Sequence, residues 1–298
     1  MYVMDPVAKG LFYLFIIASM LGVGLKVRGD EILSALKSKG LMVQALLANF
    51  VLIPAFGILC ARILPMKPDL SMTLVMLACA PGGLSALQFL TKAKDQQSLS
   101  YVGGIVIVLS LLAIFISPAM MALALPQEMS LTTPYARAFL FLLVFLLAPL
   151  LLGIFVNQKA STIAPKLAKI IALIGTLAFV AVIVMTLGMT REAKASIGKW
   201  GLLGMLVFIL FSMAVGWFLG GPRKETRPLL ATASSMRFVA LGFVITVRSF
   251  PEAGLEYPLV AFASLMITAN MILTVITMIR RKRAPKRSLK NHNSAFQY

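Results

Sequence analysis

Nine long apolar segments run through this chain of 298 residues and restrict what it can fold into. A helix of about 20 apolar residues crosses the hydrocarbon core of a bilayer. Lipid offers the backbone no hydrogen-bonding partners, so an open chain must cross it as helices. We therefore predict an all-α polytopic membrane protein with nine transmembrane helices. The segments cover residues 8–25, 41–63, 71–90, 100–124, 136–156, 168–189, 200–219, 229–247 and 258–279.

The composition agrees with this class and argues against others. Hydrophobic residues make up 60% of the chain and charged residues 13%, whereas soluble domains have roughly 45–50% and 25%. The net charge of +18 would suit nucleic acid. However, most of the cations lie in short loops and the C-terminal tail, as membrane topology signals do. We therefore expect contact with membrane lipid and no contact with nucleic acid.

The distribution of lysine and arginine also predicts the orientation. The loops after odd-numbered segments, together with residues 280–298, hold most of the 28 basic residues. Because basic residues favour the cytoplasmic side, we expect a cytoplasmic basic tail and an N-terminus outside. Residues 28–39 are typical of a short amphipathic helix at the interface. No linker is long enough to separate a soluble domain, so residues 1–298 are expected to form a single membrane domain.

One charge lies deep inside an apolar segment. Arg237 is near the middle of residues 229–247, and no acidic residue lies inside any expected span. A central arginine costs about 2.5–3.5 kcal/mol on insertion scales, so it usually faces the protein interior or a water-filled cavity and has a function. Two other roles stay open: a structural tether without substrate contact, or a side chain that reaches the membrane surface.

Two segments carry helix-breaking or polar motifs at corresponding points. The third contains residues 79–83 (CAPGG), where proline removes a backbone donor and glycine favours unwound backbone. The eighth contains the polar residues 232–237 (TASSMR), and a short pattern at 86–89 (ALQF) recurs at 240–243 (ALGF). Interrupted helices at matching points of two halves indicate a transporter binding site. We predict an inverted repeat that pairs spans two to four with spans seven to nine.

The candidate site residues come from these motifs and from polar positions in other segments. Interhelical pairing is the alternative role for the buried amides, and the hydroxyl residues of the eighth segment can instead cap freed backbone. The chain offers no metal-ligand cluster, no cofactor motif and no Ser–His or Cys–His pairing, so we expect no metal, no cofactor and no enzyme. The candidates are Asn49, Pro81, Gly82, Gly83, Ser85, Gln88, Thr232, Ser234, Ser235, Arg237 and Asn270.

Three sequence blocks follow one another in the first third of the chain, at residues 20–25 (MLGVGL), 48–55 (ANFVLIPA) and 79–83 (CAPGG). They resemble the Met-Phe-Gly-Met-Gly-Leu, the Pro-Ala-containing helix and the Cys-Pro-Gly-Gly of the bile acid:sodium symporter (BASS) superfamily. The resemblance covers about residues 10–105 and implies a nine-helix, bacterial inner-membrane member. It also implies a core with two crossing broken helices beside a panel, moving by alternating access. The core would comprise approximately residues 41–124 and 200–279, and the panel 8–25 and 136–189.

The same resemblance implies a sodium site, from which this chain departs. Bacterial members carry Thr-Ala-Ser-Asn after Pro-Gly-Gly, where this chain has residues 84–87 (LSAL). Their second crossover carries Glu-x-Gly-Met-Gln-Asn-Ser. Alignment on the methionine puts Ala233 at the glutamate and Arg237 at the glutamine. Asn49 stands where a glutamine ligand is usual. The resemblance therefore implies degenerate sodium sites.

The leading hypothesis is that Arg237 replaces the coupling cation. Its five donors would bind unwound carbonyls near residues 81–83 and side chains such as Asn49 or Gln88, leaving the broken-helix N-termini for an organic anion. The predicted function is sodium-independent transport or facilitated diffusion of a small or amphipathic organic anion. The alternatives are a sodium-coupled symporter with unusual ligands, a carrier related to auxin-efflux carriers, and a non-transporting membrane sensor or receptor.

Overall fold

The computed structural model describes residues 5–27, 39–83, 86, 96–125, 135–187, 191–221, 226–250 and 254–283. These ranges are helical apart from short connections and one isolated β-bridge. Seven helical stretches among them are long and apolar enough to cross a membrane. The all-α membrane prediction is confirmed, whereas the count of nine spans stays a prediction. Residues 28–38, residues 284–298, Ser85 and Gln88 lie outside the described ranges.

Most of the expected spans are long helices with bounds close to those predicted. Five of them are single helices: α1 (Pro6–Gly24), α7 (Gln96–Ala124), α10 (Ala164–Leu187), α11 (Arg191–Phe218) and α14 (Glu256–Arg283). Gly198 has a φ of 58° and kinks α11 near its start. A glycine adopts such a left-handed conformation without steric cost, so the break falls where the sequence allows it.

Two further spans contain a π-helical turn. The second span is α3 (Lys39–Leu47), η1 (Ala48–Leu52) and α4 (Ile53–Ile63), and the fifth is α8 (Tyr135–Leu142), η3 (Leu143–Leu147) and α9 (Ala148–Lys159). Each turn ends two residues before a proline, Pro54 or Pro149. Proline lacks the N–H of a regular helix, and a wider turn accommodates the missing bond. The first of these turns contains Asn49.

The third and eighth spans are interrupted within the motifs that predicted a break. Helix α5 (Pro68–Cys79) ends before the extended residues 80–83. Helix α12 (Thr226–Ser235) is separated from α13 (Val239–Ser249) by residues 236–238. The inverted repeat that would relate the two breaks stays a prediction.

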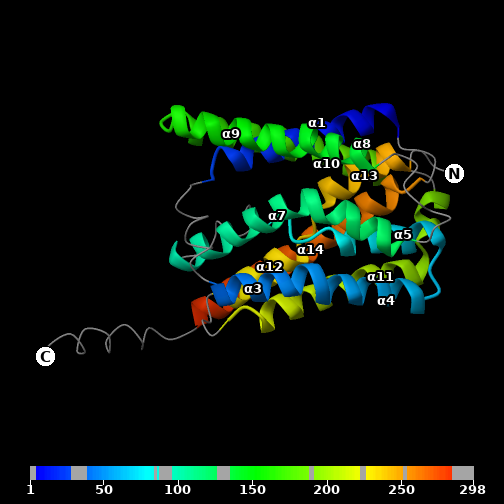
Figure 1. Ribbon diagram of the computed structural model, residues 1–298. Coiled ribbons are helices and arrows are strands. Elements are labelled where there is room, and N and C mark those ends of the chain that lie inside the picture. The colour runs from blue at the N-terminus through cyan, green and yellow to red at the C-terminus, as the bar shows by residue number, and fades with distance from the viewer. Residues whose placement is uncertain are drawn as a thin grey trace, which may run out of the picture.

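The helices form two layers (Figure 1). Helix α1 packs against α9 and α10, and together with α8 and η3 these helices form what we call the α1 layer. A Cβ on Gly24 would overlap the carbonyl oxygen of Leu150, and one on Gly153 would lie 2.8 Å from the amide of Leu25. Small residues therefore let α1 and α9 approach closely, as is usual in membrane helix pairs. The other helices, α3–α5, α7, α11–α14 and η1, form the crossover layer.

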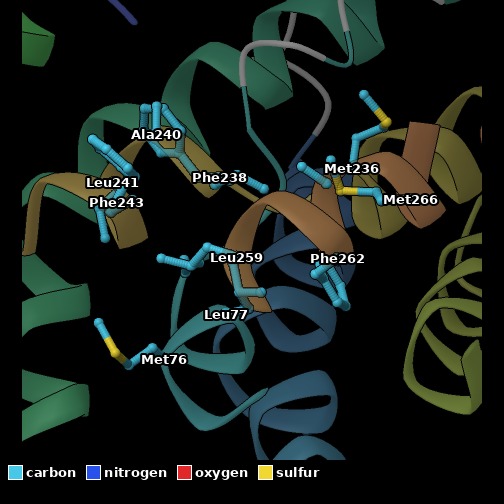
Figure 2. Packing of buried hydrophobic residues seen from close by; sticks show 14 of the residues in the cluster. Met76, Leu77, Met236, Phe238, Ala240, Leu241, Phe243, Leu259, Phe262 and Met266 are labelled. Carbon is cyan, nitrogen blue, oxygen red and sulfur yellow. The ribbon is translucent and has the colours of Figure 1, made fainter. Parts of the chain in front are cut away.

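The residues around the two breaks are buried. Figure 2 shows apolar side chains from α5, α13, α14 and the second break packed in one cluster, with Met236 beside Met266 and Leu77 near Leu259. Large apolar side chains are also exposed on the outer surface, where Leu123 is 88% exposed. A soluble protein does not expose so many, so this surface suits contact with lipid.

Candidate functional site

The two interrupted helices cross as a short antiparallel pair of extended segments. An isolated β-bridge pairs Gly82 with Arg237. Two backbone hydrogen bonds flank this bridge. The Gly83 amide donates to the Met236 carbonyl at 2.7 Å, and the Phe238 amide donates to the Pro81 carbonyl at 3.0 Å. The amides and carbonyls that lose their helical partners at the breaks thus form hydrogen bonds with one another, whereas lipid offers them no partners.

The crossing requires glycine on the first segment. A Cβ on Gly82 would overlap the carbonyl oxygen of Ala233, and a Cβ on Gly83 would lie 2.8 Å from the Phe238 Cα. Real Cβ atoms do not approach backbone this closely, so the two glycines permit the contact between the segments.

Arg237 fills the crossing with a fully buried guanidinium group, 0% exposed. The acceptors are carbonyls at the C-terminal ends of α5 and α12, and one amide oxygen. Nε donates to Leu77 O at 3.1 Å, Nη1 to Asn49 Oδ1 at 3.0 Å and Ser234 O at 3.2 Å, and Nη2 to Ala78 O at 2.7 Å. The hypothesis expected acceptors near residues 81–83 together with Asn49 or Gln88; Asn49 is one of the acceptors, and the main-chain acceptors are carbonyls that precede both breaks. The carbonyls of a last helical turn lack intrahelical partners, and they are the groups that a donor can reach.

Two helix ends explain how a cation is tolerated here without a carboxylate. The C-terminus of a helix carries an effective charge of roughly −0.5. Helices α5 and α12 both end at the guanidinium, so together they offset approximately one positive charge. No carboxylate among the described residues pairs with Arg237. The Phe208 ring centroid is 5.9 Å from Cζ, which adds a favourable cation–π contact.

Asn49 connects the first π-turn to both segments of the crossing. Its Oδ1 accepts from the Gly82 amide at 3.0 Å and from Arg237 at 3.0 Å. Its Nδ2 donates to the Ala45 carbonyl at 3.0 Å and to Ser234 Oγ at 3.3 Å. Asn49 is 0% exposed, so this side chain positions three elements at once.

A second polar pair lies beside the crossing. Ser235 Oγ donates to Asn270 Oδ1 at 2.9 Å and can alternatively reach the Thr232 carbonyl at 3.2 Å. Asn270 Nδ2 donates to the Met266 carbonyl at 2.9 Å.

The structure thus brings nine of the eleven candidate residues to one place. The nine are Asn49, Pro81, Gly82, Gly83, Thr232, Ser234, Ser235, Arg237 and Asn270.

The buried polar residues that were not predicted from the sequence include Ser110 and Glu256. Ser110 of α7 lies with its Oγ 3.5 Å from the Gly82 carbonyl, and nothing in an apolar helix distinguishes it from other serines. Glu256 is 0% exposed at the first residue of α14, with Oε1 at 2.9 Å from Lys9 Nζ. Glu256 is thus a buried acid at the very end of the last candidate span. The candidate span begins at Glu256 and not at residue 258, because helix α14 begins two residues before the expected segment.

A small cavity opens between the α1 layer and the crossing, with a volume of ≈ 40 Å³. Its walls are apolar apart from Ser19 of α1. They include the start of α13, where no side chain caps the helix. The lining residues are Phe15, Ser19, Met20, Phe179, Met236, Phe238, Val239, Ala240, Ala263, Met266 and Ile267.

No cluster of His, Cys, Asp and Glu within the described ranges has the proximity needed to hold a metal ion. The oxygen atoms gathered at the crossing are instead bound to the guanidinium.

Comparison with known families identifies the chain. The model of the Sodium Bile acid symporter family matches residues 13–197, which is more than half of the chain. The match includes the first break and ends before α12, so Arg237 lies outside it. A search of curated protein sequences finds no significant match. Together with its apolar helices, this match shows that the protein is an integral, multi-pass membrane protein that belongs to the sodium bile acid symporter family.

Proposed function

We propose that this protein carries a small or amphipathic organic anion across the membrane by alternating access, and that Arg237 takes the place of the coupling cation. Its family consists of transporters. The observation that carries the proposal is the buried guanidinium, which donates to the ends of both interrupted helices and to Asn49. A fixed positive charge there would hold the crossing together through the whole cycle without sodium.

The residues at the crossing do not fit a sodium ion. Such an ion needs several free oxygen ligands, but Asn49 Oδ1 already accepts from Gly82 and Arg237. The carbonyls of Ala78 and Ser234 accept from the same guanidinium. A second cation would therefore compete for occupied oxygens and meet a like charge at close range. Sodium coupling through this position is thus disfavoured.

The cavity beside the crossing supports the choice of an organic anion. The start of α13, which no side chain caps, lines the cavity and presents the positive end of a helix dipole, which attracts anionic groups, although the Val239 amide itself donates to the Arg237 carbonyl at 2.8 Å. Apolar walls suit the body of a carboxylate, sulfonate or steroid conjugate. A volume of ≈ 40 Å³ is too small for such a molecule, so the two layers would have to separate to admit it. We take the α1 layer as the panel and the crossover layer as the core, in a bacterial inner membrane with the N-terminus outside.

The proposal is tested with purified protein in two steps. A thermal-shift screen of taurocholate, benzoate and related anions, in sodium or potassium buffer, selects a ligand because binding raises the stability of the folded state. Uptake of the radiolabelled ligand into proteoliposomes is then compared with an inward sodium gradient and with potassium only. We expect equal rates under the two conditions and no uptake by Arg237→Ala.

The matched control is Arg227→Ala. Arg227 lies on α12, the helix that precedes Arg237, is partly buried, and donates to the Gly221 carbonyl through Nε. We expect this variant to retain uptake. Stimulation of wild-type uptake by the sodium gradient would refute sodium independence. Ligand stabilisation without any flux would instead favour the sensor or receptor alternative.

A further inference from the structure

A buried ion pair joins the two layers at one end of the bundle. Glu256 begins α14 and its side chain is 0% exposed, whereas Lys9 on α1 is 21% exposed. The Nζ–Oε1 distance is 2.9 Å, yet neither carboxylate oxygen has an aligned hydrogen bond within the described part of the chain. The carboxylate therefore depends on the charge of Lys9 for its compensation.

The face of α1 that carries Lys9 also carries aromatic side chains. Lys9, Phe12 and Tyr13 are three or four residues apart and share one face of α1. Phe12 stacks on Phe243 of α13 with ring centroids 3.9 Å apart, and Tyr13 meets the same ring edge-on at 5.7 Å. This face of α1 is thus part of the seam between the layers. The attraction between Lys9 and Glu256 weakens as the two charges separate and as entering water raises the local dielectric constant.

We propose that the Lys9–Glu256 pair is a gate of the transport cycle, and that it holds the two layers together at this end of the bundle. Separating the layers takes the carboxylate away from the cation that compensates it. A buried unpaired carboxylate is strongly unfavourable, so the gate opens only as water reaches Glu256. This inference rests on the proposed function, because it requires the layers to move.

The gate is tested by measuring a distance across the seam. Spin labels are placed on Val184→Cys of α10 and Ile63→Cys of α4, which are 61% and 68% exposed. Val184 follows Ile183, which lines a second cavity together with Tyr257 of α14, so the α10 label lies close to the gate. The native cysteines Cys60 and Cys79 are buried. Double electron–electron resonance in lipid nanodiscs then reports how often this end is open.

We expect wild-type protein to show mainly the short distance of the closed end. Lys9→Met, Glu256→Gln and their combination should raise the ratio of long to short distances by about fivefold or more, the lower end of typical coupling between sites. The swap of Lys9→Glu with Glu256→Lys should return the ratio toward the wild-type value. That recovery distinguishes a gate from general damage to the fold.

The matched control is Asp5→Asn. It removes a charge at the same end of α1, but Asp5 Oδ1 accepts only from Val7 and Ala8 of its own helix among the described residues. We expect no change in the ratio. Equal ratios in wild type, Lys9→Met and Glu256→Gln would overturn the gate. The measurement needs no substrate, so failure of the uptake assay with a shifted ratio would reject the proposed anion transport and leave the gate intact.

Discussion

Removal of the buried guanidinium should strongly destabilise the protein. In Arg237→Ala, the carbonyls of Leu77, Ala78 and Ser234 and the amide oxygen of Asn49 lose a charged donor. Hydrogen bonds to charged groups contribute about 1.5–3 kcal/mol each, so four of them set a ceiling of about 6–12 kcal/mol. The bonds are not additive, and water entering the vacated space restores part of them.

A better comparison is the loss of one partner from a buried charged network, which costs about 3–5 kcal/mol. We expect a loss of that size in Arg237→Ala, out of a total stability of about 5–15 kcal/mol for a typical domain. The apparent melting temperature in detergent should fall by about 10 °C. Arg237→Gln retains a donor and should lie between the alanine variant and wild type. Arg227→Ala, which loses one bond to Gly221, should change the melting temperature by about 2 °C or less.

Chemical rescue sharpens the same experiment. If the side chain acts as a bound cation, millimolar methylguanidinium or sodium should raise the melting temperature of Arg237→Ala and leave that of wild type unchanged. Equal melting temperatures of Arg237→Ala, Arg227→Ala and wild type would show that the guanidinium does not stabilise the crossing. Equal stabilisation of all three proteins by the added cations would contradict the role as a bound cation, because the vacated site would then not be the place where they bind.

Two further variants test the geometry of the crossing. Gly82→Ala should abolish uptake, because its Cβ would overlap the Ala233 carbonyl oxygen. The control is Gly10→Ala, which should transport as wild type does because no heavy atom lies within 4 Å of its Cβ. Equal activity of the two variants would contradict the close approach of the two segments. Asn49→Ala should lower the free energy of unfolding by about 2–4 kcal/mol, because the buried Gly82 amide and the guanidinium Nη1 both lose their acceptor. A melting temperature unchanged from wild type would show that Asn49 does not hold the segments together.

The apolar segments and the two breaks could be read from the sequence because they are local properties. Proline and two glycines at residues 81–83 interrupt a helix in almost any context, and hydrophobic runs of bilayer length predict helices by themselves. Arg237 could be identified as a candidate functional residue for the same reason, since a central arginine is rare in an apolar span.

The partners of Arg237 could not be predicted in this way. Leu77 and Ala78 contribute carbonyls, which every residue carries, so their side chains give no signal. The buried state of Glu256 likewise depends on α1 packing against the start of α14, a contact between residues at opposite ends of the sequence. Such long-range contacts depend on the tertiary arrangement, so local sequence patterns do not predict them.

The reach of the guanidinium across the sequence has a consequence for how the protein is made. Its acceptors on α5 precede it by 160 and 159 residues, so ribosomes finish α5 long before they add residue 237. During that interval, the nascent first half lies in the membrane with the carbonyls at the end of α5 lacking the hydrogen bonds that Arg237 later donates. Chains released early by a stalled ribosome retain that defect permanently, and membrane quality-control proteases should remove them faster than the full-length protein.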